Sequence, residues 1–210
     1  MKKYFNEQTA QQLTLVAKVK AKANYKEQLK AELLKLVQLT RKEEGCISYH
    51  LYADIENPDV FLFHEIWASQ ELWQKHMESD HLKAFVTKMP EWVDGDLMVE
   101  KWERSEAPAP AIDKNGLVLF AYNQALAGKE KEWTQILTDL IAPTVAEEGA
   151  LHYELHINKE DGNRFMFHET WATVESWHKH MEAKHLIQLL EIIGDYTENG
   201  ITVIKTQVID

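Results

Sequence analysis

The chain has 210 residues, of which 45% are hydrophobic and 27% charged, a composition typical of soluble globular proteins. It carries 34 acidic and 23 basic residues, for a net charge of −11, and no run rich in lysine or arginine, so neither nucleic acid nor an anionic membrane is an expected partner. No stretch approaches the roughly 18 apolar residues of a membrane span, and residues 1–8 lack the apolar core of a signal peptide, so we expect a cytoplasmic protein. The single cysteine, Cys46, excludes an intrachain disulfide and is expected to be a small buried filler.

Residues 13–20 alternate between apolar and polar positions, which predicts a strand. A helical pattern follows and ends near Glu43, and Gly45 is expected directly after that helix because glycine tolerates positive φ. Two more strands are separated by a turn at 57–58, and Ser69 is expected to cap a second helix. The predicted elements are strand 13–20, helix 25–43, strand 47–53, strand 60–67, helix 70–77, a further helical turn or two over 82–89, and strand 97–103.

The chain contains this unit twice. Residues 43–82 align without a gap with residues 147–186 at a constant offset of 104, and half of the aligned positions are identical. The stretch 105–111 between the copies is small, polar and proline-containing, as expected of a linker. We therefore predict two domains, 1–107 with a core at about 12–104 and 108–210 with a core at about 116–207, that form an intramolecular pseudo-dimer. Whether that pseudo-dimer pairs again as a homodimer is left open.

The order of elements in each unit is β-α-β-β-α-β, the ferredoxin-like motif of the α+β class, in which the first and third strands are central. The third strand is apolar on both sides, but helices can cover only one face of such a sheet. The other face therefore needs a second sheet, which the duplicate supplies. We predict two four-stranded sheets that pack face to face or close into a barrel, with the helices outside.

Three motifs resemble the antibiotic biosynthesis monooxygenase (ABM) domain family. They are Glu43-Glu44-Gly45-Cys46-x-x-Tyr49, Phe63-x-Glu65-x-Trp67 and His76-Met77-x-x-x-His81-Leu82, and both halves of the chain contain them in similar form. The resemblance implies a dimeric α+β barrel. Known members of this family include cofactor-independent quinol or aromatic-polyketide monooxygenases, haem-degrading enzymes and a sugar-signal isomerase. The Asn–Trp–His set of the haem-degrading members is absent, since its last two positions hold His76 and Val86 in the first half.

The sequence has no Gly-x-Gly-x-x-Gly fingerprint or phosphate loop, so we expect no cofactor. Oxygenation without a cofactor is chemically feasible if the substrate is electron-rich, because the anion of a hydroquinone or phenol can pass one electron to O₂. The protein must then supply an apolar pocket, a base and polar groups that hold the anion.

His76 and His180 are the candidates for that base, because they lie beside the apolar stripe of the second helix and an imidazole titrates near neutrality. The alternative is a buried histidine bonded to a backbone carbonyl. His81 and His185 follow a predicted helix break, where they either reach the pocket or serve in packing and capping. No metal is expected, because the His-x-x-x-x-His spacing does not place two ligands on one helical face.

Glu65 and Glu169 share a strand face with aromatic residues. We expect each to form an ion pair at the junction of the two sheets, with a pocket base as the alternative. His64 lies on the opposite face, as does His168, and both are expected to be interface histidines with satisfied hydrogen bonds. Four further aromatic residues either line the pocket or pack in the core: Tyr49, Trp67, Tyr153 and Trp171.

The sequence thus favours a cofactor-independent monooxygenase acting on a small aromatic or quinol-like ligand. Two alternatives stay open: a non-catalytic ligand-binding or stress protein on the same scaffold, and a small-molecule isomerase that uses the same histidines without O₂.

Overall fold

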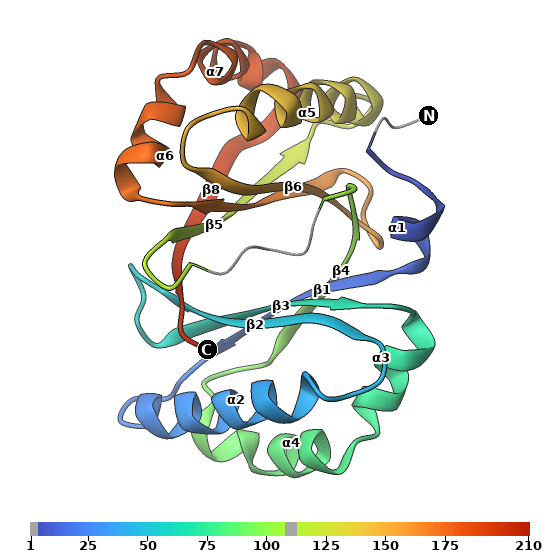
Figure 1. Ribbon diagram of the computed structural model, residues 1–210, viewed down its shortest axis with the longest axis vertical. Helices are drawn as coiled ribbons and strands as arrows, with labels where there is room; N and C mark the ends of the chain where they lie inside the picture. Colours follow the sequence, from blue (N-terminus) through green and yellow to red (C-terminus); the bar gives the residue numbers. More distant parts are fainter. Residues whose placement is uncertain (1–3, 108–112) are drawn as a thin grey trace.

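The computed structural model describes residues 4–107 and 113–210 (Figure 1). The first unit consists of α1 (Glu7–Gln11), β1 (Leu13–Lys20), α2 (Lys26–Thr40), β2 (Cys46–Asp54), β3 (Val60–Trp67), α3 (Gln70–Met77), α4 (Asp80–Trp92) and β4 (Met98–Arg104). The second unit consists of β5 (Leu117–Ala125), α5 (Glu130–Val145), β6 (Ala150–Asn158), β7 (Arg164–Trp171), α6 (Val174–Met181), α7 (Lys184–Tyr196) and β8 (Thr197–Val208). Apart from the short α1, both units have the predicted β-α-β-β-α-β order, with the second helix divided in two.

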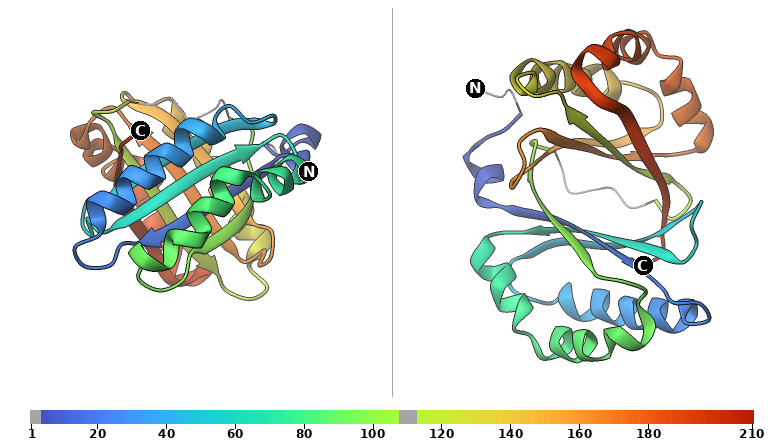
Figure 2. Two further views of the ribbon diagram at one scale, coloured as in Figure 1. Left: turned by 90° about the horizontal axis from the view of Figure 1, so that it is seen from below. Right: turned by 180° about the vertical axis from the view of Figure 1, so that it is seen from behind.

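The eight strands form one closed antiparallel barrel in the order β1-β3-β2-β8-β5-β7-β6-β4. Within the first unit, β1 pairs with both β3 and β4, so the first and third strands are central as predicted. The two units join where β2 pairs with β8 and where β4 pairs with β6. Closure removes the exposed strand edges, and the helices cover the outside of the barrel (Figures 1 and 2). The predicted fold class is confirmed, in its barrel form.

Side chains of β3 alternate between two cores, because successive residues of a strand point to opposite faces. Phe61 and Phe63 face outward and pack under the helices with Leu29 and Leu33. Leu62 faces inward and packs with residues of both units, including Trp102 of β4. Full burial of a Phe or Leu side chain stabilises the folded state by roughly 1.5–3 kcal/mol. Because the inward-facing core contains residues of both units, each unit depends on the other for the stability of that core.

The chain ends also link the units. Tyr4 and Phe5 pack against the core of the second unit. Asp210 accepts hydrogen bonds from Arg41 Nη2 at 2.6 Å and from the backbone N–H of Leu51 at 2.9 Å, both in the first unit. Each end of the described chain therefore binds the unit to which it does not belong.

Two local expectations need correction. α2 ends at Thr40 with Arg41 as its C-cap, so Gly45 does not directly follow the helix but lies in the turn that leads into β2, where its φ is +83°. The predicted linker begins too early, because Ser105 is buried and its backbone N–H donates to Leu155 of β6 at 2.8 Å. Positions 108–111 of that linker lie outside the described residues.

Cys46 is a partly buried free thiol that packs against the first core. Burial raises its pKa to about 12, so it stays protonated at neutral pH, which agrees with a filler rather than a nucleophile. Among the described residues, no helix is long and apolar enough to cross a membrane.

Candidate active site

Each unit encloses an apolar cavity between its sheet and its helices, of about 340 Å³ in the first unit and about 360 Å³ in the second. Most of the lining side chains are aliphatic or aromatic. The polar exceptions in the first cavity are Glu65, His76 and Tyr49, with Lys101 and Glu160 also present, and those in the second are Glu169, His180, Tyr153 and Asn123. Small-molecule sites typically combine such an apolar lining with a few polar groups.

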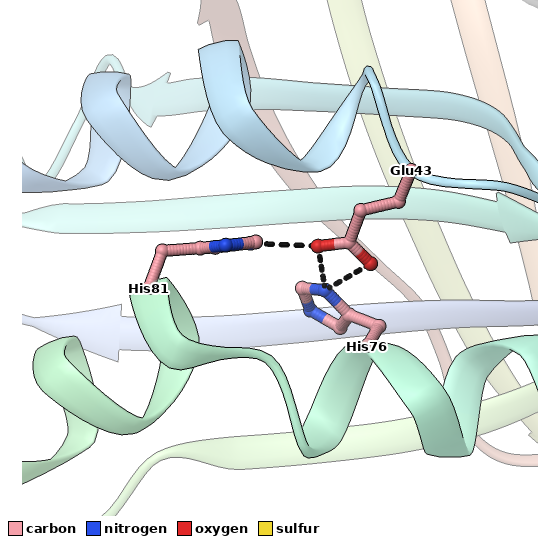
Figure 3. Close-up of side chains that lie close together, drawn as sticks. All are labelled: Glu43, His76 and His81. Carbon is pink, nitrogen blue, oxygen red and sulfur yellow. Dashed lines mark hydrogen bonds and ion pairs between the residues drawn. The ribbon is translucent and has the colours of Figure 1, made fainter.

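A carboxylate joins two histidines at the first cavity (Figure 3). His76 Nδ1 lies 3.0 Å from Glu43 Oε1, and His81 Nε2 lies 2.6 Å from the same oxygen. The second unit repeats this triad. There, His180 Nδ1 is 2.7 Å and His185 Nε2 is 2.9 Å from Glu147 Oε1. His76 is thus bonded to a carboxylate, and not to the backbone carbonyl that the alternative prediction assumed.

The turn after α2 brings the carboxylate to the histidines. The N–H of Glu43 donates to Thr40 at 3.0 Å, and the carbonyl of Gly45 accepts from Ala68 at 2.8 Å, which ties the turn to the end of β3. A Cβ on Gly45 would collide with the side chain of Leu72 in α3. Because Gly45 combines positive φ with this close approach, glycine is required where the turn passes α3.

Burial determines the charge state of His76, and its hydrogen bond to Glu43 determines which nitrogen carries the hydrogen. Burial lowers the pKa of His76 below its ordinary value of 6.5, although the bond to Glu43 acts in the opposite direction. The imidazole is therefore neutral at pH 7. Since a carboxylate only accepts hydrogen bonds, Nδ1 carries the hydrogen and Nε2 keeps a lone pair. The same reasoning holds for His180, whose pKa is also lowered by burial.

Glu65 lines the cavity on the helix side of the sheet. This position corrects the expected ion pair at the sheet junction, since no cation pairs with Glu65 in the described chain. Its Oε2 instead accepts a hydrogen bond from Trp67 Nε1 at 3.0 Å. Burial raises the pKa of Glu65 to about 7, and burial has the same effect on Glu169, which Trp171 binds at 2.9 Å. Each cavity therefore holds a carboxyl group that titrates near neutral pH.

Comparison with known proteins identifies the family. The sequence profile described as "Antibiotic biosynthesis monooxygenase" matches residues 12–88 and 117–191, which together span most of the chain. The chain is a member of the ABM family. It contains two copies of the domain, as the resemblance of its motifs implied.

Two relatives match one domain each. The protein named "Putative monooxygenase YcnE" from Bacillus subtilis is 32% identical over 94 residues, which cover 45% of this chain and 99% of that protein. An uncharacterized protein of Synechocystis is 30% identical over 79 residues, so this chain matches 38% of its own length and 54% of the Synechocystis protein. The solved structure of a "Putative monooxygenase" from Fusobacterium nucleatum has a TM-score of 0.82 over 95% of this chain and 93% of its own, and at 17% identity it shows the shared fold.

Not every predicted pocket residue of this ABM protein lines the cavity. Tyr49 and Tyr153 do, and burial raises the pKa of both phenols well above 10, so they stay protonated. Trp67 is fully buried and instead positions two pocket groups, since it donates to Glu65 and its ring centroid lies 4.8 Å from that of His76. Trp171 has the matching role in the second unit, and His81 and His185 touch the carboxylate rather than line the cavity.

Sequence reasoning missed the carboxylates that complete the triads, Glu43 and Glu147. Glu43 was placed at the end of a helix and in a motif of the family, with no chemical role, and Glu147 is its counterpart in the second copy. The available signal was the repeat itself, since both copies have Glu at this position directly before the same Glu-Gly pair. Each triad also offers three metal-ligating atoms that lie within 4.8 Å of one another.

The polar linings of the two cavities differ, since Lys101 and Glu160 line only the first and one position has changed between the copies. Val19 lines the first cavity, and its counterpart Asn123 lines the second. Asn123 Oδ1 accepts from Trp133 Nε1 at 2.6 Å, while its Nδ2 has no hydrogen-bond partner among the described residues. The second cavity thus presents a donor that the first lacks.

Proposed function

We propose that this ABM protein is a cofactor-independent monooxygenase that oxidises a small aromatic or quinol substrate with O₂, with one reaction site in each unit. The observation that carries the proposal is the neutral His76, held by Glu43 at the wall of an apolar cavity and repeated as His180 with Glu147. A base that is oriented by a carboxylate and shielded from water is suited to removing a phenolic proton.

The proposed reaction starts when Nε2 of His76 or His180 accepts a proton from a hydroquinone. The resulting anion passes one electron to O₂, and the two radicals combine to place a peroxide on a ring carbon. That carbon then loses its hydrogen as a proton, the O–O bond breaks, and water leaves to give a ketone. Overall, hydroquinone and O₂ give a hydroxyquinone and water, so the substrate supplies all four electrons and no flavin is required.

Glu65 and Glu169 are candidates for the second proton transfer. A carboxyl group with a pKa of about 7 exchanges protons readily at neutral pH. Tyr49 and Tyr153 stay protonated and are hydrogen-bonded to Thr40 and Thr144. Each phenol can donate to the substrate anion once it turns away from its threonine.

Oxygen uptake with a panel of hydroquinones, without added cofactor, tests the proposal. We expect His76→Ala combined with His180→Ala to lower kcat by about 10²–10⁴, the typical contribution of a positioned base. The matched control is His178→Ala, an exposed histidine in α6 that should leave turnover unchanged. Normal turnover in the double variant, with the melting temperature lowered, would show that these histidines are structural.

The same geometry favours one alternative. His76 and Glu65 line the same cavity, and a pair of proton-transfer groups can also isomerise a substrate by removing a proton at one atom and returning it at another. Turnover that persists under anaerobic conditions would identify an isomerase. Ligand binding with neither oxygen uptake nor isomerisation would instead identify a non-catalytic binding protein.

A further inference from the structure

A second group of titratable residues lies inside the barrel, on the opposite side of the sheets from the cavities. We call His64 of β3, His168 of β7, and Glu154 and His156 of β6 the interior cluster. All four side chains are fully buried, with 0% exposure. The strands that carry them belong to both units, so the cluster lies where the two sheets face each other.

The histidines of the cluster are not satisfied as the sequence analysis expected. The rings of His64 and His168 stack with centroids 4.2 Å apart and planes 14° apart. Both nitrogens of His168 and Nδ1 of His64 have no hydrogen-bond partner within residues 4–107 and 113–210. An imidazole always carries at least one N–H, and burying such a donor without an acceptor costs about 1–3 kcal/mol. These unpartnered nitrogens need an explanation.

Glu154 and His156 are already oriented for a ligand. Arg104 Nη1 donates to Glu154 Oε1 at 2.6 Å, which holds the carboxylate, while Oε2 faces His156 Nε2 at 3.2 Å and His152 Nε2 at 3.6 Å. His156 Nδ1 lies 3.2 Å from the backbone carbonyl of Glu154, an acceptor, so Nδ1 carries the hydrogen and Nε2 keeps the lone pair. A backbone or carboxylate contact of this kind orients the histidines that bind metals.

The spacing of the ligand atoms fits a transition metal. One atom each from His64, Glu154 and His168 lie within 4.8 Å of one another. His156 Nε2 is 3.2 Å from His64 Nε2 and 3.2 Å from Glu154 Oε2. With Zn–N bonds of 2.0–2.1 Å, neighbouring ligand atoms of a tetrahedral site are about 3.3 Å apart. The two edges from His156 already have this length, and the three edges among His64, Glu154 and His168 would shorten by up to about 1.5 Å.

We propose that the barrel interior binds one divalent transition-metal ion of the zinc type through His64, His168 and Glu154, with His156 as the fourth ligand. Three imidazoles and one carboxylate favour zinc, cobalt or nickel over calcium or magnesium, which prefer oxygen ligands. Because four protein ligands close the site and exclude solvent, the ion is structural and takes no part in the chemistry of the cavities.

The charges around the site are compatible with a cation. Glu154 supplies one negative charge, and Arg104 is held at its other oxygen and also donates to Gln12 Oε1 at 2.6 Å and 3.1 Å. The carboxylate therefore bridges the guanidinium and the ion. Since His64 comes from the first unit and the other ligands from the second, the ion would clamp the two units together.

The stoichiometry distinguishes this site from the cavity triads. At the offset of 104, the first-unit counterparts of Glu154 and His156 are His50 and Tyr52, so the cluster exists on one side of the barrel only. One ion per chain is therefore expected, whereas the triads of Glu43 and Glu147 would bind two.

The test unfolds the full chain in guanidinium with a chelator and refolds it with ZnCl₂ or CoCl₂ before removing unbound metal. We expect one ion per chain by mass spectrometry, a melting temperature raised by several degrees, and the absorption bands of tetrahedral cobalt. His168→Ala and Glu154→Gln should each abolish retention of the ion. The control His81→Ala with His185→Ala removes one member of each triad and should leave one ion bound.

Refolded wild-type protein that retains no zinc or cobalt would overturn the proposal. So would loss of the metal in the His81→Ala, His185→Ala control, or full retention in His168→Ala and Glu154→Gln. If the interior variants fail to fold, the wild-type stoichiometry and the folded control decide the matter without them.

Discussion

Replacing the cavity carboxylates with glutamine is expected to stabilise the protein at neutral and alkaline pH. Glu65 and Glu169 are buried, each accepts one tryptophan N–H, and neither has a cation as partner among the described residues. Burial opposes their ionisation. The free energy of unfolding is therefore lowered at every pH at which the same carboxyl groups are ionised in the unfolded chain. Glutamine has nearly the same shape and carries no charge, so Glu65→Gln and Glu169→Gln should remove this penalty.

The size of the penalty follows from the pKa of each group. Burial raises the pKa of Glu65 from the ordinary 4.5 to about 7. Between these values the folded carboxyl keeps a proton that the unfolded chain has lost, so the folded state binds more protons and stability falls as pH rises. At about 1.36 kcal/mol for each pH unit, the full penalty is about 3.4 kcal/mol per site and is reached slightly above pH 7. Below pH 4.5 it vanishes.

Urea unfolding of the wild type and Glu65→Gln at pH 5, 6, 7 and 8 measures this effect. The difference in free energy of unfolding should shift in favour of the variant by about 2.5 kcal/mol across this range, because part of the penalty is already present at pH 5. All other titratable groups are common to both proteins, so their contributions cancel in the difference. Glu78→Gln, at an exposed position after α3, serves as the control. A difference between Glu65→Gln and wild type that stays constant from pH 5 to pH 8 would refute the reasoning.

Two further predictions concern the turn and the interface. Gly45→Ala should destabilise the protein by about 1–3 kcal/mol and raise the exposure of His76, because the new Cβ meets Leu72. Gly95→Ala, with a similar φ of +81° but open space around its Cβ, is the matched control, and equal costs by urea unfolding would rule out the contact as the cause. Residues 1–107 produced alone should self-associate, because their half of the barrel interior, including Leu62 and Trp102, would be exposed. Sedimentation that shows a stable monomer would contradict this.

Strand alternation allowed the faces of the sheet to be predicted, but not which face meets the helices. The pattern correctly separated Glu65 and Phe63 from His64, since period two is fixed by the backbone. Both faces of β3 are buried, however, because one packs under the helices and the other fills the barrel. Hydrophobicity could therefore not decide between the two predictions for Glu65: the favoured ion pair between the sheets is wrong, and the alternative placed Glu65 in the pocket.

The triads were beyond the reach of periodicity for a different reason. The spacing of five residues between His76 and His81 argues against a shared face only if both lie on one helix. In fact α3 ends at Met77 and α4 begins at Asp80, and the break brings both imidazoles to one carboxylate. Glu43 lies in a turn, where no periodicity exists. Only the exact repeat of all three positions at an offset of 104 pointed to a shared role.

Fusion of the two units explains why the cavities match while the barrel interior does not. In a homodimer every substitution appears twice, so a buried carboxylate on one side of the axis would also appear on the other and would need its own cation. Here Glu154 and Arg104 each occur once, and their counterparts at the offset of 104 are His50 and Val208. The one-sided ion pair, and with it the one-sided interior cluster, is therefore possible only in a single chain. The triads and the cavity carboxylates stay identical in both units, which is the pattern expected if each unit keeps its own reaction site.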